Sequence, residues 1–189
     1  SVRLANSVAS NTIIFILSQV NPGFTRKLSE DISNPLCYQV ETLIFGDAIN
    51  RSLKQSRIIL GIDEKNKKLY SQLFKVLELY NCPILINNLE TAEFAKISIN
   101  AFLASDVALT NTLSDLCEKI GAQWENVASA LKLDQRIGQY RYLQPGLGIS
   151  GGNIERDLRT ITKLGAEFDV KTTMVDSIIE VNLHHRKWI

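Results

Sequence analysis

The stretch from residue 90 to residue 120 limits the possible folds of this chain more than any other. It contains neither proline nor glycine, and apolar residues recur through it at helical spacing. This pattern predicts one α-helix of about 31 residues, roughly 45 Å long at the usual helical rise. Because apolar residues occupy much of its circumference, the helix needs cover on several faces. We therefore expect it at the centre of a helical domain or at a subunit interface.

Four short apolar segments precede this helix and predict β-strands at residues 12–20, 36–40, 56–62 and 82–88. They are rich in β-branched and aromatic residues, and their apolar character is nearly continuous. Between the last two, residues 63–80 carry leucine and valine at helical spacing, which predicts a helix. Strand, helix and strand in this order are typical of a parallel, doubly wound sheet.

No strand pattern follows this region. Three more helices are predicted instead, at residues 124–133, 154–168 and 170–188. The expected fold class is therefore an α/β chain: a partial Rossmann-like parallel sheet, followed by an all-α domain built on one long helix. The change in pattern places the domain boundary between residues 1–88 and residues 89–189.

The charge balance argues against a nucleic-acid partner and against a membrane-binding patch. The 189 residues carry 21 Lys and Arg against 20 Asp and Glu, and no run gathers five or six like charges. The longest apolar run, at residues 12–17, is far shorter than the roughly 18 residues that a membrane-spanning helix requires. These features favour a small neutral or anionic ligand.

Cysteine usage indicates a reducing compartment, and we expect the cytoplasm. Cys37, Cys82 and Cys117 are widely separated and have no partner at metal-ligand spacing, so we expect buried thiols and no metal. The adjacent His184 and His185 end a polar helix, where solvated side chains are expected rather than metal ligands.

Lys96 and Asn100 lie four residues apart on the long helix and therefore share one face. Apolar neighbours on that face would partly desolvate the ammonium group, which favours a role in proton transfer. A solvated or snorkelling lysine is the more common arrangement. The pair alone leaves both interpretations open.

Residues 146–152 form a glycine-rich loop directly before a predicted helix. Glycines allow the backbone to approach a ligand closely, and N–H groups ahead of a helix start commonly bind anions. Asp157 is expected in the first turn of that helix, where the helix dipole stabilises a carboxylate. The glycines alone fit a plain flexible connector equally well.

Several segments resemble the UDP-glucose/GDP-mannose dehydrogenase family in order and spacing. Residues 88–127 are similar to its pattern TAE-x-x-K-x-x-x-N-x-[FY]-L-A followed by N-E. Residues 133–158 are similar to D-x-R-I-G followed by P-G-x-G-x-G-G-x-C-x-x-K-D. Upstream, SQVNPG at 18–23 resembles S-T-V-x-P-G, and YQVETLIFGDA at 38–48 resembles P-E-F-L-R-E-G-x-A.

The resemblance implies an enzyme of polysaccharide biosynthesis that oxidises a hydroxyl of a nucleotide-sugar with NAD. Lys96, Asn100 and Asp157 fall on the family's catalytic positions, where lysine and aspartate handle the water and proton of the reaction. Glu41 matches the glutamate of the P-E-F segment.

Binding roles are implied for further positions. Arg136 matches an arginine that reaches the neighbouring subunit's substrate in the family dimer. Tyr142 and the loop backbone around Gly148 and Gly151 would line the nucleotide-sugar pocket.

The chain departs from the family pattern at positions close to the reaction. Asn153 replaces the cysteine that traps the aldehyde as a thiohemiacetal, and an amide cannot replace a thiolate in covalent catalysis. Ser18 and Gln19 match the cofactor-side S-T of the turn, with glutamine in place of threonine. Val40 replaces the proline, and Phe45 the second glutamate, of the P-E-F-L-R-E segment.

The family's cofactor turn, G-x-G-x-x-G, has no match in this sequence. By the resemblance, residues 1–88 are the C-terminal part of a Rossmann-like NAD-binding domain. Residues 89–189 are the central helical domain for substrate and dimerisation, with the 90–120 helix as the homodimer interface. The opening at Ser1, without an initiating methionine, is consistent with a fragment.

Two functions follow as expectations. The first is a fragment or divergent member of an NAD-dependent nucleotide-sugar dehydrogenase, UDP-glucose 6-dehydrogenase-like, whose oxidation stops short of the uronic acid because of Asn153. The second is a non-catalytic pseudoenzyme that dimerises or binds a nucleotide-sugar without turnover. An intact cofactor turn upstream would favour the first.

Overall fold

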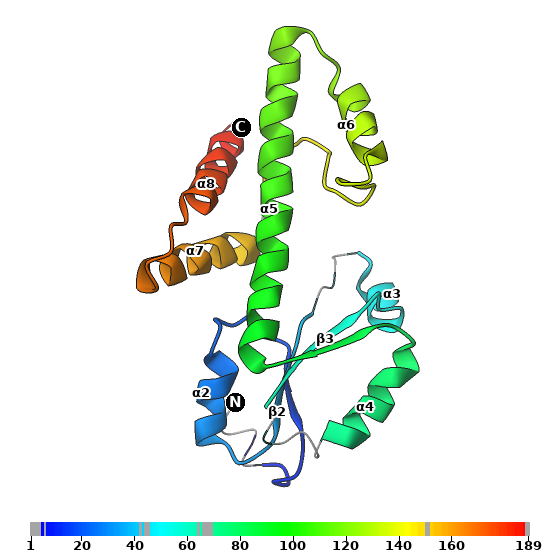
Figure 1. Cartoon of the computed structure of the whole chain (residues 1–189), viewed down its shortest axis with the longest axis vertical. Coiled ribbons are helices and arrows are strands. Elements are labelled where there is room, and N and C mark those ends of the chain that lie inside the picture. Colours follow the sequence, from blue (N-terminus) through cyan, green and yellow to red (C-terminus); the bar gives the residue numbers. More distant parts are fainter. Residues whose placement is uncertain are drawn as a thin grey trace. The chain divides into compact units, whose positions relative to one another are not determined.

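The computed structural model describes residues 5, 7–41, 43, 46–63, 65, 70–149 and 152–187. The chain forms two compact units, Ser1–Lys96 and Ile97–Ile189 (Figure 1). The units divide inside the long helix, whereas the sequence places the domain boundary at the start of that helix.

The first unit contains a four-stranded sheet in the order β1-β2-β3-β4. Its strands are β1 (Ile14–Ile16), β2 (Leu36–Gln39), β3 (Ile58–Ile62) and β4 (Ile84–Asn87). Each lies inside one of the apolar segments that predicted it. The pairs β1–β2 and β3–β4 are parallel, so the Rossmann-like class is confirmed with one exception.

That exception is the β2–β3 pair, which is antiparallel, with Tyr38 opposite Gly61. The end of β2 therefore lies next to the start of β3, and the connection between them does not have to cross a face of the sheet. The helix in this connection, α3 (Ala48–Leu53), has no buried residue. It is too short and too exposed to cover a sheet face as a crossover helix does, so the expectation of a wholly parallel sheet was wrong here.

Helices cover both faces of the sheet (Figure 1). They are α2 (Phe24–Asp31) and α4 (Ser71–Leu77), the latter followed by the 3-10 turn η2 (Glu78–Tyr80). Leu28 of α2 packs with Leu36 of β2 on one face. Tyr70 and Leu77 pack with Cys37 of β2 on the other. Leu36 and Cys37 are consecutive, and successive strand residues point to opposite faces.

The long helix, α5, covers Leu89–Ile120, which confirms the prediction for residues 90–120. Its first turn packs on β3, where a Cβ placed on Gly61 would lie 2.8 Å from the Cβ of Ala92 and 3.0 Å from the Cα of Leu89. Only glycine permits so close an approach. This packing explains why the start of α5 belongs to the compact unit of the sheet.

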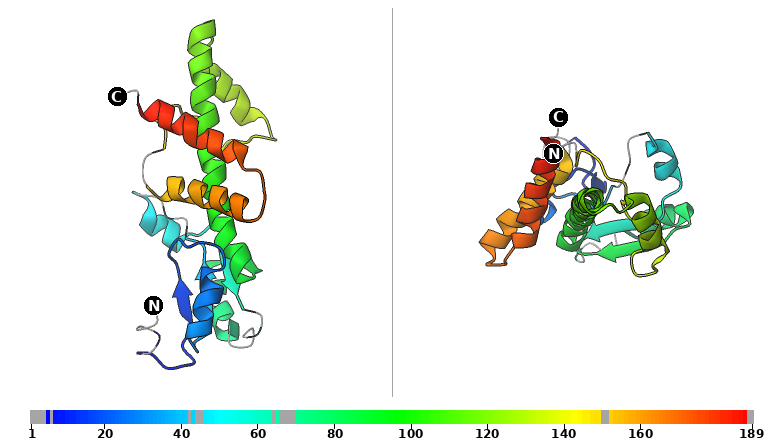
Figure 2. Two further views of the ribbon diagram at one scale, coloured as in Figure 1. Left: turned by 90° about the vertical axis from the view of Figure 1, so that its left-hand side faces the viewer. Right: turned by 90° about the horizontal axis from the view of Figure 1, so that it is seen from above.

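The second unit places three helices around the rest of α5: α6 (Trp124–Leu133), α7 (Gly152–Glu167) and α8 (Thr173–Arg186). α7 and α8 lie on one side of α5, and α6 lies on the other (Figure 2). The core towards α7 and α8 contains Ala104, Ala108, Leu158 and Ile178. The core towards α6 contains Cys117, Trp124 and Ala128. Among the residues that the structure describes, no helix combines the length and the apolar content needed to cross a membrane.

Candidate functional site

A buried hydrogen bond joins α5 and α7 in the second unit. Asn100 Nδ2 donates to Asp157 Oδ2 at 2.7 Å, and both side chains are almost completely buried. A buried carboxylate needs such a donor, because its desolvation is otherwise costly. α7 begins at Gly152, so Asp157 lies in the second turn and not in the first, as the sequence suggested. The bond from Asn100, and not the dipole of the first turn, is the interaction seen at this carboxylate.

Asn153 lies one turn before Asp157 on α7, so the two residues share one face of the helix. Its side chain is exposed, and its Oδ1 accepts a hydrogen bond from the Arg156 guanidinium at 3.3 Å. A carboxamide can accept and donate hydrogen bonds but offers no thiolate. The residue expected at the nucleophile position therefore supplies polarity without a covalent nucleophile.

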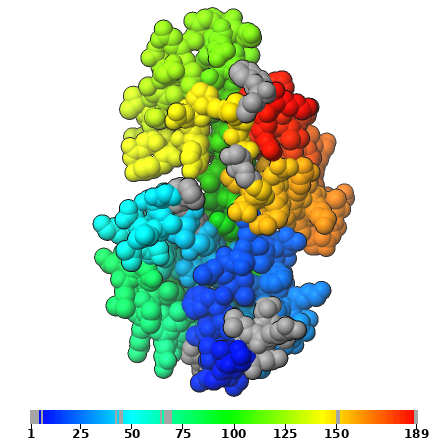
Figure 3. Space-filling model, turned by 180° about the vertical axis from the view of Figure 1, so that it is seen from behind, coloured from blue at the N-terminus to red at the C-terminus, as the bar shows by residue number. Residues whose placement is uncertain are grey.

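The connection between α6 and α7 lies against α5 (Figure 3). The Thr110 hydroxyl of α5 donates to the carbonyl of Tyr142 at 2.9 Å. The Trp124 indole N–H of α6 donates to the carbonyl of Leu143, also at 2.9 Å. Both carbonyls are held by side chains of neighbouring helices.

The glycine-rich part of the same connection is held through its N–H groups. The N–H of Gly146 donates to Asn111 Oδ1 of α5 at 2.9 Å, and the N–H of Ile149 donates to Asn182 Oδ1 of α8 at 2.5 Å. A plain flexible connector would not be fixed at four backbone groups, so that alternative does not fit residues 142–149. The same bonds leave these two N–H groups unavailable to an anion. Gly151, the other expected pocket glycine, lies outside the described residues.

An ion pair also holds this connection to α5. Arg141 pairs with Asp106, whose carboxylate is almost completely buried. Burial raises the pKa of Asp106, and the Arg141 guanidinium and the Tyr142 backbone offset part of that rise. The pair therefore compensates a charge that the helix core would otherwise leave unsatisfied.

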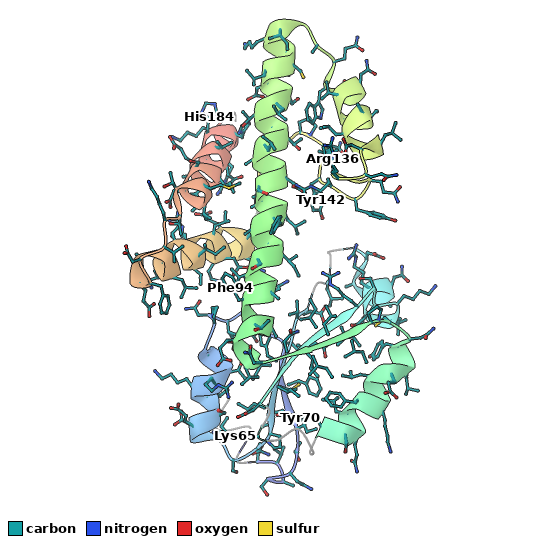
Figure 4. The ribbon with its side chains drawn as sticks, in the orientation of Figure 1. Lys65, Tyr70, Phe94, Arg136, Tyr142 and His184 are labelled. Carbon is teal, nitrogen blue, oxygen red and sulfur yellow. The ribbon has the colours of Figure 1, made fainter. Side chains whose placement is uncertain are left out.

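Arg136 and Tyr142 both project from the connection between α6 and α7 (Figure 4). The Arg136 side chain is 88% exposed and bonds Asp134 through Nε at 3.0 Å and a terminal nitrogen at 2.6 Å. This bond raises the pKa of Arg136 and lowers that of Asp134. Tyr142 is 45% exposed. Two groups able to contact a ligand are thus presented by a fixed backbone.

In the first unit, Lys96 contacts Glu41 through the backbone. Lys96 Nζ donates to the carbonyl oxygen of Glu41 at 2.5 Å, and the lysine is half-buried. Glu41 also lines a polar hollow of about 320 Å³ that includes Arg51, Lys54 and Arg57. The structure thus brings the expected lysine and glutamate together, through a carbonyl and not through the carboxylate.

Ser18 and Gln19 lie in the loop that follows β1 and leads to α2, with Ser18 exposed and Gln19 half-buried. The start of α2 is bound by Glu93 of α5, whose carboxylate accepts the N–H of Gly23 at 2.6 Å and that of Thr25 at 2.8 Å. Glu93 is fully buried, and α2 has no cap from its own N-terminal side chain. A helix N-terminus is a common phosphate site, but here the protein's own carboxylate occupies it.

The backbone N–H groups of Gly23 and Thr25 at the start of α2 are therefore not available to the phosphates of a dinucleotide. The sequence has no G-x-G-x-x-G turn, and the N–H groups that start α2 are bound to Glu93.

The sequence did not point to Glu93, Asn111 or Asn182 as functional residues. Each is a polar residue on a helix, and its partner lies at least 33 residues away along the chain. Glu93 and Asn111 are part of the family patterns TAE-x-x-K and N-E, which gave them no role of their own, whereas Asn182 lies outside the quoted motifs.

His185 corrects the expectation of a solvated helix end. It is buried, with Nδ1 2.9 Å from the carbonyl of Val181 and Nε2 3.0 Å from Asp115 Oδ2 on α5. It faces α5 because the residue one position after exposed His184 falls on another side of α8. Within the described part of the chain, no cluster of three or more His, Cys, Asp or Glu side chains could hold a metal ion.

Residues 90–184 match the profile of the UDP-glucose/GDP-mannose dehydrogenase family, central domain. The chain belongs to the UDP-glucose/GDP-mannose dehydrogenase family. The matched residues run from the first turn of α5 to the last turn of α8, and they include Asn100, Asp157 and the loop of residues 142–149. The resemblance drawn from the motifs is confirmed.

Individual members of the family are similar over nearly the whole chain. The UDP-glucose 6-dehydrogenase YwqF of Bacillus subtilis (strain 168) is 30% identical over 95% of this chain and 42% of its own length. The UDP-glucose 6-dehydrogenase of Rhizobium meliloti (strain 1021) is 30% identical over 91% of this chain and 38% of its own length. The chain thus spans about two fifths of the length of these relatives.

A solved structure of the family has the same fold. The UDP-glucose dehydrogenase of the hyperthermophilic archaeon Pyrobaculum islandicum superimposes with a TM-score of 0.82 at 26% identity, covering 91% of this chain and 41% of that one. The similarity includes both the mostly parallel sheet and the helical part.

Proposed function

We propose that this chain carries the substrate side of a divergent NAD-dependent nucleotide-sugar dehydrogenase, UDP-glucose 6-dehydrogenase-like, that acts on a sugar hydroxyl. The proposal is carried by two observations: the loop of residues 142–149 is fixed by side chains of three helices, and Asn100 and Asp157 form a buried pair in the same unit. A loop held in this way can present Tyr142 and Gly148 to a nucleotide-sugar without a large ordering cost. By the family pattern, we propose that Gly151 lines the same pocket. Membership of the family is the only support for NAD as the cofactor.

Lys96, Asn100 and Asp157 are the proposed catalytic residues, of which Lys96 and Asp157 handle the proton. Lys96 and Asn100 are one turn apart on α5, and Asn100 bonds Asp157. Oxidation of an alcohol to an aldehyde would need a cofactor to take up a hydride and a base to take up a proton. The carboxylate of Asp157, held by Asn100, is suited to accept that proton. Glu41 is proposed to act beside Lys96, and Ser18 and Gln19 on the cofactor side.

Asn153 is the residue that limits this chemistry. A second hydride transfer in the family requires a covalent adduct between the aldehyde carbon and a thiolate sulfur. The carboxamide of Asn153 forms no such adduct, so we propose that the oxidation to the uronic acid does not proceed. A protein that performs one hydride transfer, or that binds the nucleotide-sugar without turnover, is consistent with this residue.

The non-catalytic alternative is favoured by the same position. In that case the family's helical domain serves for nucleotide-sugar binding and dimerisation only. An intact dinucleotide turn in the complete reading frame supports the dehydrogenase, whereas a degenerate turn supports the pseudoenzyme. Under either alternative we propose that the protein is located in the cytoplasm, because Cys37, Cys82 and Cys117 are all free thiols.

Nucleotide-sugar binding is tested by calorimetry on the full-length protein with UDP-glucose as the probe. We expect binding, and we expect Tyr142→Ala to weaken it by at least about tenfold, because the ring would lose its stacking contact. Tyr140 lies in the same connection and is 90% exposed, so Tyr140→Ala is the matched control and should bind like the wild type. Absence of wild-type binding, or an equal loss in both variants, would contradict the proposal.

A further inference from the structure

Asn182 is a buried carboxamide on α8 that none of the sequence motifs includes. Its side chain is 6% exposed, and its Oδ1 accepts the N–H of Ile149 at 2.5 Å. A carboxamide oxygen suits this place because it accepts a hydrogen bond without burying a charge.

Gly148 lies close to the same oxygen atom of Asn182. Its φ is +88°, a conformation that side chains disfavour. A Cβ placed on it would lie 2.5 Å from Asn182 Oδ1. Asn182 therefore fills the space that a side chain at position 148 would need, and the loop approaches α8 only because that residue is glycine.

Asn182 binds Ile149, which is the last described residue of the loop before α7. Ile149 also packs with Ala104, Leu158 and Ile178 in the core of the second unit. Only residues 150 and 151 separate it from α7, which carries Asn153 and Asp157. Ile149 is thus held by its side chain and by its N–H, and Asn182 supplies the second of these restraints.

We propose that Asn182 is a positioning residue, which fixes the backbone of Gly148 and Ile149 so that the loop meets the nucleotide-sugar in one conformation. This inference rests on the proposed function. By this inference, α8 affects the affinity for the nucleotide-sugar without contacting it, because Asn182 of α8 holds the loop. A preorganised loop binds more tightly because less conformational freedom is lost on binding.

The test compares Asn182→Leu, which removes the acceptor at similar volume, with Asn182→Asp, which keeps an acceptor oxygen. Glu180→Gln, an exposed position on the same helix, is the control. In Asn182→Leu, we expect amide exchange at Ile149 to accelerate by about tenfold or more, with the amides of α5 and α7 unchanged. We also expect UDP-glucose affinity to fall by about tenfold. Asn182→Asp should lie nearer to the wild type in both measurements.

A substitution in the loop tests the contact between Gly148 and Asn182 from the other side. Gly148→Ala places a methyl group against Asn182, and we expect the same fall in affinity. Glu180→Gln again serves as the control and should bind like the wild type.

A merely structural role for Asn182 would speed exchange across the whole second unit, and that result would overturn the inference. Unchanged exchange at Ile149, or unchanged affinity despite faster local exchange, would overturn it as well. If wild-type protein does not bind UDP-glucose, the proposed function fails and the inference fails with it. If the wild type binds and Asn182→Leu binds equally well, only the inference fails.

Discussion

Cys37 and Tyr70 are two ionisable side chains in the core between the sheet and α4. Burial raises the pKa of the Cys37 thiol to about 12. Burial, with a smaller contribution from Cys37, raises the pKa of Tyr70 to about 12. The Tyr70 hydroxyl donates to the carbonyl of Leu36 at 2.7 Å and is buried. Both groups are neutral in the folded chain, so their ionisation favours the unfolded chain.

The free energy of unfolding should therefore fall as the pH rises from the ordinary thiol pKa of 9.0 towards about 12. A pKa that folding raises contributes stability below its unfolded value, and this contribution is lost as the pH rises through the folded value. Each group adds a slope of up to about 1.4 kcal/mol per pH unit. Urea unfolding of Cys37→Ala should show a shallower alkaline slope than the wild type, with a constant difference between about pH 7 and pH 8. Parallel slopes above pH 9 would contradict this account.

At the scale of elements, α2 depends for its N-terminus on a side chain of α5. Glu93 accepts two backbone N–H groups there, and it does so while fully buried. Glu93→Gln keeps one acceptor oxygen and turns an NH2 group towards the other N–H. We expect it to lower the free energy of unfolding by about 1–3 kcal/mol, as for other buried groups left without a partner.

Glu90 is the matched control, one turn earlier on the same helix. It bonds Arg26 at 2.8 Å and 3.1 Å, but the pair is partly exposed, at 38% for Arg26 and 40% for Glu90. Glu90→Gln should cost less than about 1 kcal/mol, because exposed ion pairs contribute little. Equal losses in the two variants, measured by urea unfolding, would show that Glu93 is not a special cap.

The elements that the sequence predicted well are those with a long local pattern. α5 was predicted closely because apolar residues at helical spacing over the whole of residues 90–120 form a local pattern, which needs no knowledge of distant partners. The direction of β3 was not, because it depends on whether the connection from β2 crosses a sheet face. His185 was misjudged because the polar helix end gave no sign of Asp115 on α5.

The candidate site divides in the same way. Lys96, Asn100 and Asp157 were predicted from the family motifs, and the structure adds the bond between the last two. The role of Asn182 could not be predicted from the sequence. Its partner Ile149 lies 33 residues away and contributes only a backbone N–H, which every residue except proline has. Side chains that bind a distant backbone leave no local pattern in a sequence.

At the scale of the whole molecule, α5 carries an exposed apolar stripe. Phe102, Leu109 and Leu116 follow one another at intervals of seven residues and are 66%, 59% and 52% exposed. This spacing is typical of a helix seam that packs against another helix. Exposed apolar side chains along one line favour a partner surface, and we propose a homodimer through α5.

Leu109→Glu should therefore shift the protein from dimer to monomer, because the interface would bury a charge. Leu133 on α6 is 84% exposed and lies outside the stripe, so Leu133→Glu should remain dimeric. Light scattering at micromolar concentration gives the mass of each variant. A monomeric wild type would contradict the proposed dimer.

The central claim is that the family's site is retained while its covalent step is lost at Asn153. It is tested most directly by the yield of NADH per sugar when the full-length protein is incubated with UDP-glucose and NAD. The account predicts no steady formation of a uronate, and at most one NADH for each sugar converted. Steady formation of the uronate with two NADH per sugar would contradict it.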